Sequence, residues 1–453
     1  MLPAKRAFLE EMLNKTGYRM RRHFRNASII DASGGPPFRG TVTVEGAKIA
    51  AVTRSPFEAA SSPDEEIIDC TGYTLLPGLT EAHCHISFNN LTSIYSAVEI
   101  QPEDHSLAAL ANAQLLLRCG FTSLFSAASA KPRVDVAVRD AINKGLFEGP
   151  RIRAAGQEIT PTGNLGDLDT NYFEFPRNVR FSVACDGADA FMRAARLAAR
   201  DGVDTIKVNV SGDRDWGHMH ADDTVTVITE RELEAVMEVA NARRLMVATH
   251  CSSSAGVKMC VRQGVQVIYH APHADTEARD MLESVKDKVF VVPAAGFPIS
   301  MLCRHDRFGL NWSAEKLASL ESEIVTFTRC MRDLHKRGVR VLPGGDYGAF
   351  ITAPMGENAK DFEYFVDLFG FTPMEVIIAA TRHGADLMQM GHEAGQIRAG
   401  FYADLVILDG DPLADIRIFQ DQDRILGVMK GGQFAKRDPA LSRAAADPMR
   451  RTG

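Results

Sequence analysis

Long apolar runs are missing from this chain of 453 residues. None approaches the roughly 20 residues that a membrane-spanning helix requires. The first residues mix both charge signs and lack the apolar core of a secretion signal. Neither charge sign dominates, since 51 Lys and Arg stand against 58 Asp and Glu, and the net charge of −7 leaves no basic surface. These absences predict a cytoplasmic protein that binds neither nucleic acid nor a membrane.

Closely spaced cysteine pairs are missing as well. The eight cysteines are spread thinly and show no CxxC spacing. This argues against a disulfide framework and predicts reduced, mostly buried thiols. Cys84 and Cys251 each stand next to a histidine of interest. Because neighbours on a strand point to opposite faces, we expect these two thiols to face the core and not a metal site.

The middle of the chain alternates short β-branched runs with longer segments of helical periodicity. The predicted strands are Thr74–Leu79, Phe121–Ser126, Ile152–Gly156, Thr205–Val210, Leu245–His250, Val265–His270, Val289–Ala294 and Arg340–Pro343. The predicted helices include Ser106–Leu117, Gly187–Ala199, Glu230–Ala242, Ser254–Gln263 and Glu315–His335. Thr229 and Glu232 form a capping box before one of them. Eight strands alternating with helices predict an α/β fold, a closed (β/α)₈ TIM-like barrel.

Both ends of the chain differ from this middle. They alternate apolar and polar residues between Gly and Pro turns, without helical stretches. Neither end can bury an apolar face alone, so the two should pair into a small β-sandwich. A short amphipathic helix before them could pack on another subunit, so we expect a homo-oligomer. The predicted parts are a helical extension (1–22), the sandwich (23–72 and 394–437), the barrel (73–393) and a polar tail (438–453).

Polar residues that can bind a metal ion follow several predicted strands, where the reactive residues of a barrel collect. His83 and His85 stand two residues apart after the first strand, which places both imidazoles on one face. His250 and His270 close the fifth and sixth strands and should lie at the same level of neighbouring strands. Asp346 follows the eighth strand, where its carboxylate could bind an ion or accept a proton. We therefore expect these side chains to share a site.

Lys207 lies on the fourth predicted strand among β-branched residues and should point inward. Its stem could pack while the amine reaches water. Alternatively, a desolvated amine near cations loses its proton and takes up carbon dioxide, giving a carbamate that can bridge two ions. Burial and neighbouring positive charge both lower an amine's pKa, which this reaction requires. Gly344 and Gly345, just before Asp346, would let the backbone approach closely.

These residues, in this order, resemble the amidohydrolase superfamily in its binuclear, carboxylated-lysine branch. The opening TGYTLLPGLTEAHCH and the closing GQIRAGFYADLVILDGDPLADI are also similar to that superfamily. The resemblance spans about Arg25 to Lys436. IKVNVSGD and the pair VATH…VIYHAPHAD look most like the group of prolidase-like dipeptidases and ochratoxin-type amidases, which also holds hydrolases of phenylurea and thiocarbamate herbicides.

The resemblance implies a set of ligands for two divalent metal ions. It assigns His83, His85 and Asp346 to one ion and His250 and His270 to the other, with carboxylated Lys207 as the bridge. Zinc is the expected ion, with manganese and cobalt as alternatives. A bridging hydroxide would be the nucleophile, and Asp346 would act as general acid and base. The expected reaction is hydrolysis of a C–N bond in a small-molecule amide, urea or carbamate, such as a phenylurea.

Residues around these motifs could contact the substrate. His273 begins a loop over the site, three residues past His270. Tyr172, with Phe173 and Phe175, could form an apolar wall that suits an aryl substrate. Other tempting residues are interpreted without a role in the site. They are the loop histidines His218 and His220, the acidic turn Asp222 and Asp223, and the Phe-rich segment Asp361–Phe371, read as a core helix.

Three alternatives stay open. A mononuclear deaminase usually needs an HxxE-type acid, whereas CSSSAG follows His250 here. A non-catalytic scaffold would have lost ligands, whereas every expected ligand position is filled. A prolidase-like dipeptidase should hold the substrate carboxylate with a cation, and Arg304 or Arg307 could do so. We favour an uncharged or aryl substrate.

Overall fold

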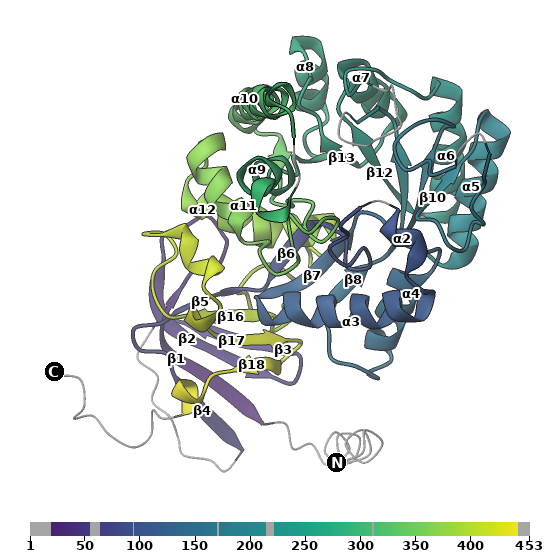
Figure 1. Ribbon diagram of the computed structural model, residues 1–453. Helices are drawn as coiled ribbons and strands as arrows, with labels where there is room; N and C mark the ends of the chain where they lie inside the picture. Colours follow the sequence, from purple (N-terminus) through teal and green to yellow (C-terminus); the bar gives the residue numbers. More distant parts are fainter. Residues whose placement is uncertain are drawn as a thin grey trace.

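The computed structural model describes residues 20–54, 64–93, 95–169, 172–213, 222–309 and 312–442. A barrel surrounded by helices stands beside a sheet that is built from both chain ends (Figure 1). This confirms the predicted barrel with a smaller β domain. The helical extension predicted over 1–22 lies outside the described residues up to residue 19, and β1 already begins at Arg21.

The barrel has eight strand positions, and parallel strands fill them. These strands are β6 (Leu79–Cys84), β7 (Phe121–Ser126), β8 (Arg151–Arg153), β9 (Ala155–Thr160), β11 (Thr205–Asn209), β12 (Met246–Cys251), β13 (Val267–His270), β14 (Phe290–Val292) and β15 (Arg340–Val341). Two consecutive strands, β8 and β9, together fill one of these positions, and β10 (Ser182–Ala184) pairs with the edge of β9. Backbone hydrogen bonds close the ring, from Ser129 N to Gly156 O at 2.9 Å and from Ala82 N to Pro343 O at 3.3 Å.

Helices cover the outside of the barrel. They are α2 (Ser96–Glu99), α3 (Pro102–Arg118), α4 (Val134–Asn143), α5 (Ala188–Asp201), α6 (Glu230–Arg243), α7 (Ser254–Gln263), α8 (Thr276–Ser284), α9 (Gly296–Arg304), α10 (Ala314–Lys336), α11 (Lys360–Tyr364), α12 (Pro373–Ile378) and α13 (Gly384–Leu387). The predicted capping box is present, since Thr229 accepts from Glu232 N and Glu232 accepts from Thr229 N. The Phe-rich segment is helical as expected, and Phe362, Phe365 and Phe369 are buried.

The second sheet joins the two ends of the chain. Its strands are β1 (Arg21–Ile29), β2 (Phe38–Glu45), β3 (Lys48–Thr53), β4 (Glu65–Asp69), β5 (Thr74–Pro77), β16 (Leu405–Leu408), β17 (Ile425–Lys430) and β18 (Gln433–Arg437). β16 pairs antiparallel with β5, which also pairs with β1. The late strands therefore lie beside the early ones (Figure 1), and Phe24, Val42 and Leu405 share one buried core.

The run Thr74–Leu79, predicted as the first barrel strand, is divided between the two parts. Thr74–Pro77 forms β5 of the end sheet, and Leu79 begins β6, the true first strand of the barrel. Gly78 separates them and packs so tightly on Thr122 that a side chain would not fit. The prediction of a single strand was wrong. Both faces of β5 and of β6 are buried, so the apolar sequence continues across the boundary and does not reveal it.

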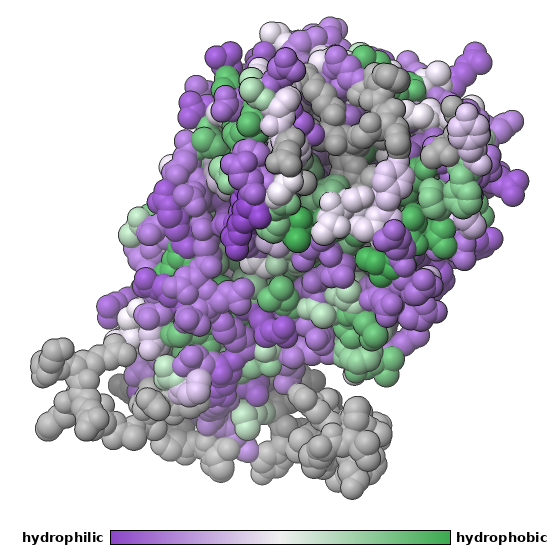
Figure 2. Space-filling model, in the orientation of Figure 1, coloured by the Kyte–Doolittle hydropathy of each residue, from purple (hydrophilic) through white to green (hydrophobic). Residues whose placement is uncertain are grey.

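The surface and the end of the chain add two details. Pro439–Ser442 forms a 3-10 turn whose Leu441 is buried in the core of the end sheet, so this part of the predicted polar tail is packed. Hydrophilic side chains cover most of the face shown in Figure 2. In the described parts of the chain, no helix is both long and apolar enough to cross a bilayer.

Candidate metal centre

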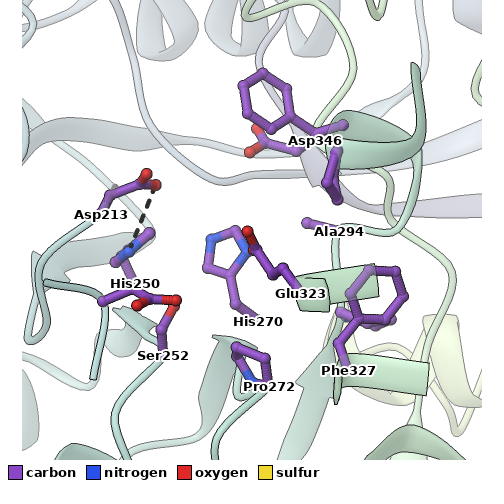
Figure 3. Close-up of a pocket in the computed structure, with 13 residues that line it drawn as sticks. Asp213, His250, Ser252, His270, Pro272, Ala294, Glu323, Phe327 and Asp346 are labelled. Atoms are coloured by element: carbon purple, nitrogen blue, oxygen red, sulfur yellow. Dashed lines mark ion pairs between the residues drawn. The ribbon is translucent and has the colours of Figure 1, made fainter. Parts of the chain in front are cut away.

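A cavity opens at the carboxyl ends of the barrel strands. His250, His270 and Asp346 line it (Figure 3). Phe297 and Phe327 from α9 and α10 form part of its wall. The cavity therefore lies where the sequence placed the reactive residues.

The first cluster joins two histidines to Asp346, the carboxylate that lines this cavity. His83 is the penultimate residue of β6, and His85 follows the strand on the same face. Their Nε2 atoms lie 3.4 and 2.9 Å from Oδ1 of Asp346. Ligand atoms of the three residues lie within 4.8 Å of one another. This spacing is close to that of side chains sharing one ion, because zinc–ligand bonds are about 2.0–2.2 Å.

The second group lies beside the first. His250 is the penultimate residue of β12 and His270 closes β13, and their ring centroids are 4.4 Å apart. His270 in turn lies 5.5 Å from the ring of His83. Lys207 on β11 is 2% exposed, and its Nζ lies 4.5 Å from the ring centre of Tyr269, which stacks on His83. The structure thus brings together all six residues that the sequence singled out.

The backbone around these residues is unusual. The backbone φ angles of His270 and Asp346 are 72° and 62°, in a region that residues other than glycine seldom adopt. Such conformations persist only where the surrounding structure imposes them, and they cluster at functional sites. A Cβ on Gly344 would come within 2.7 Å of His83 N, which confirms the close approach expected of this glycine.

Gly344→Ala should therefore displace the backbone of His83 and so weaken the metal centre. The added methyl would collide with the backbone of His83 and with Val292, at 2.6 Å from its Cγ1. We expect a loss of stability of about 1–3 kcal/mol, as for other overpacked cores, together with reduced metal binding. Thermal unfolding and metal analysis would measure both. Gly35→Ala is the control, because a Cβ there would meet only Ser33 Oγ, at an ordinary contact distance of 3.4 Å; equal effects of the two changes would contradict the prediction.

Two buried carboxylates hold the ligand-bearing segments from behind. Glu81 accepts hydrogen bonds from His83 N at 3.1 Å and from Asn358 Nδ2 at 2.9 Å. Asp361 accepts from Gly344 N at 3.0 Å. Burial raises the pKa of Asp361 to about 7, against the backbone donors that favour its charged form. These carboxylates fix the backbone segments that carry His83 and Asp346.

Burial also sets the protonation of the site. It lowers the pKa of His83 and His250 well below the ordinary value, and that of His270 to about 4. Burial lowers the pKa of Lys207 as well, although Glu158 and Asp346 oppose the shift. Asp346 stays ionised, since the neighbouring histidines outweigh the effect of its burial and lower its pKa. Neutral imidazoles and an ionised carboxylate are the forms that bind metals.

The residues present fit a divalent ion. Imidazole nitrogens and a carboxylate oxygen converge here, a donor set that suits zinc, manganese or cobalt. The Nδ1 atoms of His83 and His85 are buried, and within the described ranges neither has a hydrogen-bond partner. Cys84 and Cys251 are buried in the core as expected. A set of polar atoms gathered at such cost indicates a ligand-binding role.

Several other residues lie differently from the sequence interpretation. Asp223, read as part of a solvated turn, is buried, lines the cavity and lies 2.7 Å from Nε2 of His273. The prediction was wrong because its partner is fifty residues away in the sequence. Tyr172 is 97% exposed. Among the described residues, the lining of the cavity includes neither Tyr172 nor His273. His218 and His220 lie outside the described residues.

Sequence reasoning missed three residues of this cavity or its surroundings. Asp213 lies 3.9 Å from Nε2 of His250 (Figure 3). Glu323 enters the cavity from α10. Tyr269 packs on His83. The signals for Asp213 and Tyr269 were their places within SGD and YH, next to motifs already in use, whereas no local pattern marks Glu323.

Comparison with known proteins agrees with this geometry. The model of the amidohydrolase family matches residues 74–435. Ochratoxinase of Aspergillus niger is 27% identical over 438 residues, covering 90% of this chain and 86% of that protein. Its solved structure has a TM-score of 0.81, with 23% identity over 95% of this chain and 99% of that one.

Two further solved structures are similar. One is a Xaa-Pro dipeptidase with bound methionine in the active site, which has a TM-score of 0.78 and 25% identity, covering 91% of this chain and 99% of that one. The other is phenylurea hydrolase B, with a TM-score of 0.72 and 22% identity, covering 91% of this chain and 96% of that one.

The matched residues span the barrel, the six gathered side chains and the strands β5, β16 and β17 of the end sheet. The chain belongs to the amidohydrolase family and is an enzyme that acts on carbon–nitrogen bonds. The family is generally metal-dependent, and the cluster of His83, His85 and Asp346 is present here.

Proposed function

We propose that this enzyme hydrolyses the C–N bond of a small-molecule amide, urea or carbamate at a centre of two divalent ions. The gathering of four histidines, Asp346 and the buried Lys207 supports this most strongly, and His250, His270 and Asp346 of this group line the cavity. In the proposal His83, His85 and Asp346 hold one ion and His250 and His270 the other. Carboxylated Lys207 lies between them, and zinc is the expected ion, with manganese or cobalt as alternatives.

In the proposed reaction, different residues of the chain bind the metal, transfer the proton and exclude water. Bound divalent ions supply an acidified water and a polarised carbonyl oxygen. Asp346 accepts the proton of the attacking water at its carboxylate and delivers it to the leaving nitrogen. Neutral His250 and His270 each keep one unprotonated ring nitrogen that can act as a ligand, and Nε2 of His250 lies 3.2 Å from Gly212 O. Tyr269 excludes water from behind His83 and Lys207, since its ring is fully buried there.

An aryl substrate suits the cavity better than a dipeptide. Phe297 and Phe327 provide aromatic walls. Arg304, considered as a carboxylate-binding residue, instead contacts Glu357 at 2.6 Å and the carbonyl of Thr352 at 3.1 Å. The name of one similar protein, phenylurea hydrolase B, agrees with a urea substrate that carries an aromatic group.

The first experiment measures metal content per chain, by elemental analysis of protein purified without chelators and supplied with bicarbonate. We expect about two divalent ions per chain, the number in two-metal hydrolytic sites. Removal with a chelator should abolish hydrolysis of a panel of aryl amides, ureas, carbamates and dipeptides, and added zinc or manganese should restore it.

Other outcomes would contradict the proposal in distinct ways. About one ion per chain would make Lys207 an ordinary lysine and favour a mononuclear deaminase. No bound ion and no turnover of any compound in the panel would favour a non-catalytic scaffold. Hydrolysis restricted to the dipeptides would favour a prolidase-like enzyme.

A further inference from the structure

We propose that Glu323 makes this enzyme select substrates that carry an organic ammonium group near the scissile C–N bond. The inference rests on the proposed hydrolysis and adds the charge class of the substrate. It starts from the wall of the cavity that α10 supplies, which lies outside the set of metal-binding candidates.

Glu323 and Phe327 stand four residues apart on α10 and therefore lie on one face of the helix. Both line the cavity, as does His270, and Figure 3 shows the carboxylate of Glu323 directed into it. Glu323 is half-buried, whereas Phe327 is only 3% exposed. A helix thus presents a carboxylate and an aromatic ring to the same space.

Aromatic rings next to a carboxylate are the combination that binds organic cations. The face of an aromatic ring attracts a cation through its quadrupole, more strongly where water is excluded. Phe297, which is 8% exposed, and Phe327 supply such rings, and Pro298 adds an apolar surface. A partly desolvated carboxylate adds a charge interaction that is stronger than the same pair in water. An alkylated ammonium matches both features, since its alkyl groups suit the rings.

The charges around the cavity point the same way. Besides Asp346, its lining contains the carboxylates of Asp213, Asp223 and Glu323. Asp213 and Asp223 face histidines, at 3.9 Å from His250 and 2.7 Å from His273. In the described part of the chain, the lining includes no lysine or arginine. A substrate carboxylate placed near α10 would therefore meet carboxylates of the same sign.

A matched series of anilides tests this selection. All share one acyl group, and the ring carries trimethylammoniomethyl, neopentyl or carboxymethyl at the para position. The first two groups have the same shape, but the ammonium lowers the basicity of the leaving aniline through the methylene, so the ratio of their rates is compared with the same ratio in Glu323→Gln. We expect kcat/KM to be roughly tenfold higher for the cationic anilide than for the neopentyl one, as for a partly screened charge pair, and lowest for the carboxylate.

Glu323→Gln should remove most of this preference. The ratio of kcat/KM between cationic and neopentyl anilides should fall about tenfold, and the carboxylate should improve relative to both. Glu321→Gln is the matched control, because Glu321 is an exposed glutamate on the same helix. Its ratio should equal that of the unchanged enzyme. Titration calorimetry with the corresponding cationic and neopentyl anilines, on the metal-loaded enzyme, measures the same preference without turnover.

The outcomes separate this inference from the proposed function. Hydrolysis of all three anilides at similar rates, or a ratio that Glu323→Gln leaves unchanged, would overturn the inference and leave the proposed hydrolysis standing. Absence of hydrolysis for every anilide, amide, urea and carbamate would contradict the proposed function instead. In that case the calorimetric preference for the cationic aniline, and its loss in Glu323→Gln, would still decide whether the cavity selects ammonium groups.

Discussion

Lys207→Ala should lower metal occupancy and remove most of the activity. The side chain is 2% exposed on β11, at the base of the site, and burial lowers its pKa toward the neutral amine that carboxylation requires. In the proposed centre, alanine would remove the bridging anion and leave a void at the buried position of the lysine side chain. We expect activity to fall by about a thousandfold or more, comparable to the loss of a central catalytic group, and metal content to fall below one ion per chain.

Rescue experiments distinguish the carbamate from a lysine that only fills space. Formate, acetate or propionate should restore part of the activity of Lys207→Ala, because a small carboxylate can occupy the position of the missing anion. Lys131→Met provides the control. Lys131 is also 2% exposed, but its Nζ donates to Ala97 O at 2.7 Å, outside the cavity. That change should cost stability and keep the metal. Full activity with bound metal in Lys207→Ala would refute the bridging role.

Asp346→Asn should reduce turnover by about a hundredfold to ten-thousandfold, the range for losing a general acid or base. The amide keeps the shape of the side chain but cannot take up a proton as the carboxylate does, and it replaces the charged Oδ1 that faces both His83 and His85. One ligand charge is lost as well, so the affinity for one of the ions should fall. Single-turnover kinetics at saturating metal separate the chemical defect from this loss of occupancy.

A second isosteric change serves as the control for Asp346→Asn. Asp386→Asn alters an exposed carboxylate on α13, 3.9 Å from Arg340 Nη1. It should leave turnover and metal content unchanged. If Asp346→Asn turned over substrate at the normal rate once its metal content was restored, another group would have to carry the proton.

The ligand positions could be predicted because barrel topology converts sequence order into spatial proximity. His250 and His270 lie at the ends of consecutive parallel strands, so their rings must meet at one edge of the barrel. His83 and His85 share a face because side chains alternate along an extended chain. The glycine at position 344 indicated that two backbone segments approach closely there. These are local rules whose consequences do not depend on how the loops pack.

Features that depend on partners distant in the sequence could not be predicted. Thr74–Pro77 looks like any buried strand until β16 is placed beside it. Asp223 looks like part of a solvated turn until His273 reaches it. The periodicity of the sequence predicts helix α10. Which of its turns faces the cavity depends on how the helix packs on the barrel, so the place of Glu323 in the cavity wall could not be predicted.

The junction between β5 and β6 links the order of synthesis to the formation of the catalytic centre. β5 ends at Pro77 and β6 begins at Leu79, so the strand that carries His83 continues directly from a strand of the end sheet. Pro77 pairs with Leu405, which the ribosome delivers only when the barrel is nearly complete. Contacts this distant form slowly, since a long loop must close first. During synthesis, His83 and His85 must therefore follow an end sheet that is still incomplete until β16, β17 and β18 have emerged from the ribosome.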